Sequence, residues 1–175
     1  GDGFDDLLLG APEADFGAGD PAGVAAVIFG HAGEFAPELR LDDLDGGNGF
    51  RLGSSADNFG LGVALGDAGD MNGDGLADFF VVARAHPNGT GDVFVVFGRE
   101  GAFGATFDLA TLDGSNGLRI MNPDRFGGSA SAAGDVNGDG YDDLLVGGGF
   151  ADLGRSGNSF LIFGSGDGFA ATLDV

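Results

Sequence analysis

Cysteine, tryptophan and lysine are absent from this chain of 175 residues. Without cysteine it can form neither a disulfide scaffold nor a thiolate metal site. Seven arginines stand against 28 Asp plus Glu, which gives a formal charge of −21. Phosphate backbones would repel so negative a chain, and we therefore expect no nucleic-acid partner. No apolar run approaches the roughly 18 residues of a spanning helix, so we expect no membrane insertion.

The acidic residues are almost all aspartates, since only Glu13, Glu34, Glu38 and Glu100 are glutamates. Aspartate suits turns and is a compact oxygen ligand for hard cations. A hydrophobic content of 43% with 17 Phe argues against disorder. At this length we expect a single domain, residues 1–175, with a sizeable core.

The chain repeats itself with a period of about 66 residues. The recurring segments are 48–52 (NGFRL) at 116–120 (NGLRI), 70–75 (DMNGDG) at 135–140 (DVNGDG), and Phe-Gly at 29–30, 97–98 and 163–164. Because the offsets of 65 to 68 residues agree apart from small drifts, loop insertions explain their differences. We predict repeat units at 1–47, 48–115 and 116–175.

Each unit has the pattern of short β-strands. Strands are expected at 61–68, 78–85, 92–97 and 117–121, with a hairpin turn at 87–91 (PNGTG). No helical stripe of useful length is present. Four short strands per unit are typical of a propeller blade. The sequence therefore predicts an all-β fold of four-stranded antiparallel β-propeller blades.

The two ends of the chain match interior parts of the repeat. Residues 1–6 (GDGFDD) match 138–143 (GDGYDD), and 172–174 (TLD) match 111–113 (TLD). The chain is then about two and a half blades, a partial ring, because propellers close with 4 to 8 blades. Unpaired strand edges are an aggregation hazard. We expect further blades of the same parent chain, or a protein partner, to cover them.

An acidic loop of the form D-x-[DN]-x-[DN]-G-x-x-D occurs twice. Side-chain oxygens at positions 1, 3 and 5, the carbonyl at position 7 and a carboxylate at position 9 form an oxygen cage suited to Ca²⁺, and glycine at position 6 permits the sharp turn. The predicted ligands are Asp70, Asn72, Asp74, Leu76 and Asp78 in one copy and Asp135, Asn137, Asp139, Tyr141 and Asp143 in the other.

Other metals and other calcium loops fit less well. Zinc would need nitrogen or sulfur ligands, which the loops lack. An EF-hand needs a glutamate at position 12, where this chain has Val81 and Val146. An ordinary solvated turn is the alternative explanation, but two copies in register with the repeat favour calcium.

These motifs resemble the FG-GAP repeat. The matching segments are 59–63 (FGLGV) with 69–78 and 97–98, 126–129 (FGGS) with 134–147 and 163–164, and 5–12 (DDLLLGAP). The resemblance implies the seven-bladed β-propeller of integrin α subunits and of many bacterial secreted or surface proteins, with Ca²⁺ in the loops. A truncated first loop offers Asp2, the Phe4 carbonyl and Asp6, while its positions 1 and 3 lie outside the chain.

The expected function is that of an extracellular, cell-surface or periplasmic binding, adhesion or structural module. An accessory subunit docked by its open edges, or the non-catalytic propeller of a secreted hydrolase, are the alternatives. His31 and His86 are lone histidines near turns, and no nucleophile or base accompanies them. We therefore predict neither an enzyme nor a small-molecule substrate.

Overall fold

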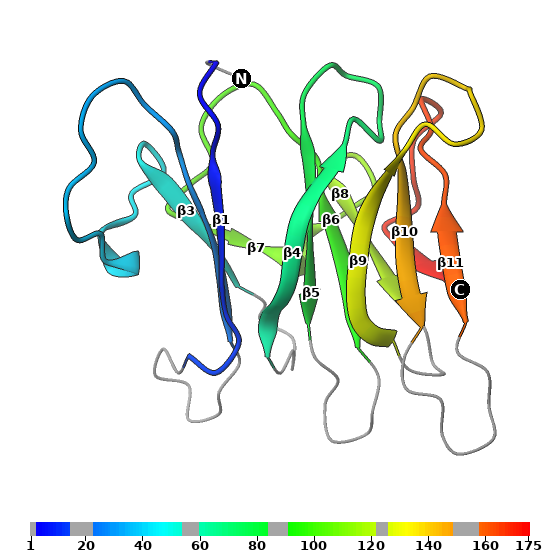
Figure 1. The fold of residues 1–175 in the computed structure, drawn as a ribbon, viewed down its shortest axis with the longest axis horizontal. Coiled ribbons are helices and arrows are strands. Elements are labelled where there is room, and N and C mark those ends of the chain that lie inside the picture. The colour runs from blue at the N-terminus through cyan, green and yellow to red at the C-terminus, as the bar shows by residue number, and fades with distance from the viewer. Residues whose placement is uncertain (1–2, 15–22, 54–59, 84–90, 122–125, 149–157) are drawn as a thin grey trace.

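The computed structural model describes residues 3–14, 23–53, 60–83, 91–121, 126–148 and 158–175. These residues form twelve strands and two short 3-10 helices, η1 (Leu41–Asp43) and η2 (Leu109–Thr111), in three sheets that stand side by side (Figure 1). No helix in the described ranges is long and apolar enough to span a membrane.

We name the three sheets blades A, B and C in chain order. Blade A contains β1 (Leu7–Ala11), β2 (Val24–Ile28), β3 (Gly49–Gly53) and β7 (Thr106–Asp108). Blade B contains β4 (Leu61–Gly69), β5 (Asp78–Ala83), β6 (Asp92–Val96), β8 (Gly117–Met121) and β12 (Thr172–Asp174). Blade C contains β9 (Phe126–Gly134), β10 (Asp143–Gly148) and β11 (Ser159–Ile162). The all-β prediction is confirmed, because the three sheets are mostly antiparallel, form no closed barrel within the described ranges and are consistent with blades of a partial propeller.

The strands of blade B are apolar on both faces because a neighbouring blade packs on each. Val81 and Ala83 of β5 join the hydrophobic cluster between blades A and B, whereas Phe80 and Val82 join the cluster between blades B and C. Burying such a side chain fully contributes roughly 1.5–3 kcal/mol. The unbroken apolar runs of β5 and β6, which carry no alternation, follow from this double burial.

Two of the strands are parallel additions that sequence reasoning missed. β7 lies parallel to β3, with Thr106 opposite Arg51, and β12 lies parallel to β8, with Thr172 opposite Arg119. Both are three residues long. The residue before each strand accepts a backbone hydrogen bond from the arginine amide, Ala105 from Arg51 at 3.0 Å and Ala171 from Arg119 at 2.9 Å.

This register corrects the predicted match of 172–174 with 111–113. The structural counterpart of β12 is β7 at 106–108, since each lies parallel to the outer strand of the preceding blade. Threonine, an apolar residue and aspartate occur in that order in both candidate segments. Three residues could not distinguish them without knowledge of the sheet partner.

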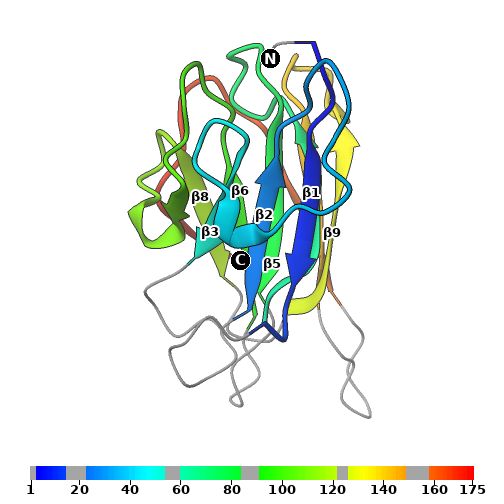
Figure 2. The same ribbon diagram turned by 90° about the vertical axis from the view of Figure 1, so that its left-hand side faces the viewer.

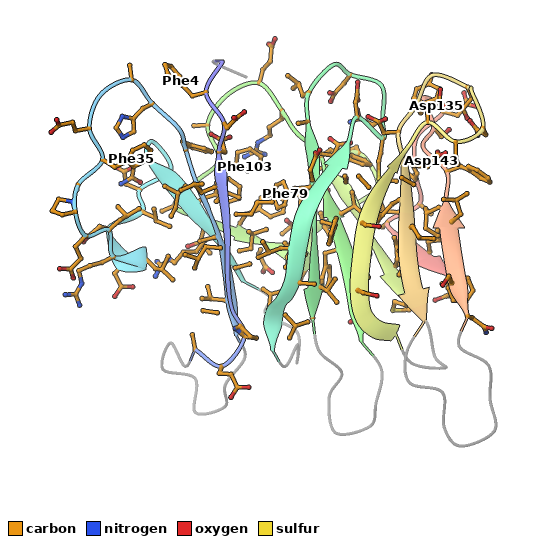
Figure 3. The ribbon with its side chains drawn as sticks, in the orientation of Figure 1. Phe4, Phe35, Phe79, Phe103, Asp135 and Asp143 are labelled. Carbon is orange, nitrogen blue, oxygen red and sulfur yellow. The ribbon has the colours of Figure 1, made fainter. Side chains whose placement is uncertain are left out.

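The connection that follows β6 packs back onto blade A. The Phe103 ring stacks on Phe50 with centroids 4.2 Å apart, and Phe107 meets Phe103 edge-on at 5.9 Å. All three side chains belong to the cluster between blades A and B, and Figure 3 shows Phe103 beside Phe79 in this region. Each blade interface is therefore completed by chain that follows the third strand of the later blade.

The two outer blades expose apolar side chains on their outward faces. We define the A face by Leu7, Leu9, Phe35 and Leu39, and the C face by Val136, Leu145, Leu161 and Phe163; all eight are exposed. The counterparts of the A face in blade B pack in the cluster between blades A and B; they are Phe79, Val81, Phe103 and Phe107. The counterparts of the C face pack in the cluster between blades B and C; they are Met71, Phe80, Val95 and Phe97. Figure 2 looks toward blade A. The outward faces thus carry the same residue types that form the interior blade interfaces.

Candidate metal centre

The two complete acidic loops occupy the same place in consecutive blades. Loop B, residues 70–78, joins β4 to β5, and loop C, residues 135–143, joins β9 to β10. Both lie at the upper edge of the sheets in Figure 1. In Figure 3, Asp135 and Asp143 mark the start and the end of loop C.

Loop B is wound by hydrogen bonds from its own backbone to its acidic side chains. The Asp74 amide donates to Asp70 Oδ1 at 3.0 Å and to Asn72 Oδ1 at 2.9 Å. The Gly75 amide donates to Asp70 Oδ2 at 2.9 Å, and the Leu76 amide to Asp74 Oδ1 at 2.8 Å. Gly75 has φ of 84°, a conformation that favours glycine. The side-chain oxygens at positions 1 and 3 are thereby gathered on one amide.

Loop C repeats these bonds position by position. The Asp139 amide donates to Asp135 Oδ1 at 3.1 Å and to Asn137 Oδ1 at 3.0 Å. The Gly140 amide donates to Asp135 Oδ2 at 2.8 Å, and the Tyr141 amide to Asp139 Oδ1 at 3.0 Å. Gly140 has φ of 96°. The recurring sequence therefore folds twice into the same loop.

The aspartate at position 9 is buried beneath each loop and ties it to the end of the third strand. Asp78 is 1% exposed; its carboxylate accepts from the Met71 amide at 2.8 Å and the Gly98 amide at 2.9 Å. Asp143 is fully buried and accepts from the Val136 amide at 3.0 Å and the Gly164 amide at 2.9 Å.

The truncated first loop keeps part of this arrangement. The Gly30 amide donates to Asp6 Oδ1 at 2.9 Å, as the Gly98 and Gly164 amides do to their aspartates. Phe4 is exposed, and Asp2 lies outside the described residues. The recurring Phe-Gly pair was the sequence signal for this anchor, because its glycine is the amide donor in all three copies.

Burial raises the pKa of Asp78 to about 6. Hydrogen bonds from the Gly98 and Met71 amides oppose this shift, whereas the negative charges of Asp74 and Asp70 add to it. In loop C, the hydrogen bond from the Gly140 amide is the main reason that the pKa of Asp135 is lowered. The carboxylates of loop B are therefore close enough to repel one another, and a cation would relieve that repulsion.

The donor set fits a hard cation, because it consists of carboxylate and amide oxygens. The structure brings Asp70, Asn72 and Asp74 together around one amide and places Asp78 below them. Within the described ranges, however, no three carboxylate or imidazole groups gather as a metal cluster. The oxygens at positions 1, 3 and 5 accept from loop amides instead, so the calcium ligands stay a prediction.

The fold and the loops define a class of protein, a partial β-propeller with an acidic loop between the first two strands of a blade. Residues 126–162 match the family model described as the FG-GAP repeat. These residues run from β9 through loop C to β11. The chain therefore carries an FG-GAP repeat, as the sequence motifs indicated.

Most of the chain is also similar to integrin α chains. It is 37% identical over 145 residues to "Integrin alpha-PS5" of Drosophila melanogaster, covering 80% of this chain and 12% of that protein. It is 31% identical over 150 residues to "Integrin alpha-4" of Xenopus laevis, covering 84% and 13%. It is 27% identical over 146 residues to "Integrin alpha-6" of Gallus gallus, covering 83% and 12%. The chain is integrin-α-like and spans about an eighth of the length of these relatives.

Proposed function

We propose that this chain is part of a calcium-binding FG-GAP β-propeller that serves as a binding or adhesion module. The observation that carries the proposal is the repetition of one hydrogen-bond pattern in loops B and C, which gathers the oxygens at positions 1 and 3 on the amide of position 5. Both blades thus place the same side-chain oxygens at the same loop positions, which supports a shared role in holding a cation.

Asp70, Asn72, Asp74 and Asp78 would hold the ion in loop B together with the Leu76 carbonyl, and their counterparts would do so in loop C. A bound Ca²⁺ supplies positive charge that offsets the clustered carboxylates. Extracellular calcium modules commonly bind at about 10⁻⁴–10⁻³ M, a concentration present outside the cell. This requirement and the similarity to integrin α chains support an extracellular, cell-surface or periplasmic location.

The partners that we propose are proteins, and first of all further blades of the same kind. The A face and the C face present the residue types that fill the two interior interfaces, which supports a neighbouring blade on each side. The similarity to integrin α chains supports binding rather than catalysis. A protein ligand would then be recognised by the assembled propeller.

Native mass spectrometry with and without EGTA tests the calcium proposal. We expect two calcium ions per chain, one in each complete loop, and a lower melting temperature after EGTA treatment because ligand binding stabilises the folded state. Asp139→Ala should lose one ion, whereas Asp167→Ala, at an exposed acid outside both loops, should keep both. A chain that binds no calcium and melts at the same temperature in EGTA would contradict the proposal.

A further inference from the structure

Loops B and C are joined to each other by hydrogen bonds across the blade interface. The Asp70 amide donates to Asp142 Oδ2 at 2.8 Å, and the Asp142 amide donates to the Asp70 carbonyl at 3.2 Å. Both backbone polar groups of Asp70 are therefore bonded to one residue of the next blade. A third bond, from the Ser165 amide to the Met71 carbonyl at 2.8 Å, lies beside them.

Side-chain packing reinforces this link. The Asp142 side chain lies against Gly69, where an added Cβ would meet Asp142 Cβ at 2.5 Å. The Tyr141 ring lies against Gly73, where an added Cβ would come within 2.9 Å of Tyr141 Cδ1. Position 8 of loop C thus contacts the start of loop B, and position 7 contacts its middle. Gly69, at the end of β4, and Gly73, within loop B, are what allow the approach.

The link is a property of this pair of loops and not of the repeat in general. Position 8 of loop B is Ala77, which has no carboxylate to offer to blade A. Position 8 of the truncated first loop is Asp5, an exposed residue just before β1. The chain therefore contains the linking aspartate once at an interior interface and once where no described blade precedes it.

We propose that Asp142 couples the two acidic loops, so that cation binding in one strengthens binding in the other. This inference rests on the proposed calcium function. Asp70 is the first ligand position of loop B, and Asp142 precedes Asp143, the last ligand position of loop C. A cation held by loop C fixes Asp142 and with it the backbone of Asp70, so loop B then loses less conformational freedom on binding. Asp142 is a positioning residue in this scheme and contacts no ion itself.

A double-mutant cycle followed by calorimetric calcium titration tests the coupling. Loop C is disabled with Asp135→Ala plus Asp139→Ala, and the dissociation constant of loop B is compared with its value in the intact chain. We expect loop B to bind at least about fivefold more weakly when loop C is disabled. In an Asp142→Ala background, disabling loop C should change the dissociation constant of loop B by less than about twofold.

Two further variants separate coupling from general damage. Asp142→Asn keeps an oxygen that can accept from the Asp70 amide, so it should retain the coupling. Asp5→Ala removes the aspartate at the same repeat position but away from this interface, and it should leave the calcium affinities unchanged. If the doubly disabled chain does not fold, the two stepwise dissociation constants of the otherwise intact chain, with and without Asp142→Ala, decide the question.

Tyr141 provides a readout that blade stability alone would not move. It is the single tyrosine in a chain without tryptophan. Because its ring lies on Gly73, calcium entering loop B should change tyrosine emission even when loop C is disabled. Two loops that bind calcium independently, or a coupling that survives Asp142→Ala, would overturn the inference and leave the calcium function standing. A chain that binds no calcium would overturn the proposed function itself.

Discussion

A glycine follows each of β2, β6 and β11, and the acidic loop of the same blade lies close against it. An added Cβ on Gly98 would lie 2.6 Å from the Ala77 carbonyl oxygen and 2.8 Å from Leu76 Cβ. Gly98→Ala should therefore push loop B away and disturb the bond to Asp78, lowering the free energy of unfolding by about 1–3 kcal/mol. Urea denaturation monitored by circular dichroism would measure the change.

Gly53 is the matched control for this substitution. It also lies in a blade, at the end of β3, but an added Cβ would meet nothing within 4 Å. Gly53→Ala should leave the free energy of unfolding within about 1 kcal/mol of its original value or raise it slightly. Equal changes in unfolding free energy at the two positions would mean that Gly98 is not needed for the close approach of loop B.

The turns before β3 and β8 should make the stability of the fold sensitive to acid. The pKa of Asp113 is lowered, first by the hydrogen bond from the Ser115 hydroxyl, and the pKa of Asp45 is lowered by the amides of Gly47 and Asn48. A folded-state pKa below the unfolded value gives stability that is present above the unfolded pKa and is lost as pH falls through the folded pKa. Their contribution should therefore disappear as pH falls from about 5 towards 2.

Thermal melts across this pH range in EGTA would test the two turns. The double variant Asp45→Asn plus Asp113→Asn should be less stable than the original chain near neutral pH and approach it at low pH. Glu34→Gln plus Glu100→Gln removes the same two charges at other positions and serves as the control. The same pH profile in both double variants would assign the effect to net charge and not to the turns.

At the scale of elements, the backward-reaching connection after β6 gives a matched pair of phenylalanines. Phe103 is buried against Phe50, while Phe35, its counterpart in blade A, is exposed. Phe103→Ala should cost about 3–5 kcal/mol of unfolding free energy because it opens a cavity in the cluster between blades A and B. Phe35→Ala should change it by no more than about 0.5 kcal/mol. Comparable losses at both positions would show that Phe35 is covered in solution.

The strands were predictable where the chain itself carries their pattern. β8 has the bounds 117–121 that the sequence predicted, and β5 and β6 begin where the apolar runs begin. β7 and β12 were missed because three residues carry no periodicity, and their partners lie in another blade. The hairpin predicted at 87–91 lies largely outside the described residues.

The acidic loops were predictable as units, and their surroundings were not. The spacing identified positions 1 to 9, and the structure gathers positions 1 and 3 as that spacing suggested. The spacing did not reveal that Asp78 and Asp143 accept hydrogen bonds from strand-end amides, or that Asp142 reaches the preceding loop. Those contacts join residues that the repeat places in different strands or blades, so the spacing within one loop does not record them.

At the scale of the whole molecule, the C face offers a test of how the blade interfaces are built. Leu145→Gln plus Leu161→Gln should change the unfolding free energy of this chain by no more than about 0.5 kcal/mol, because both side chains are exposed. Binding of a hydrophobic dye should fall. Phe80→Ala, at the counterpart of Leu145 in the interior interface, should cost about 3–5 kcal/mol. A large loss from the glutamine pair would indicate that the C face is buried in solution.

The stacking of Phe103 on Phe50 also sets an order of events during synthesis. Phe50 belongs to blade A, yet the ring that covers it comes about fifty residues later in the chain. At roughly 5–20 residues per second, a ribosome needs several seconds to deliver that cover. Part of the aromatic surface of a blade therefore stays exposed until the next blade emerges. A pause in translation between the two would prolong the interval in which a chaperone or another nascent chain can reach that surface.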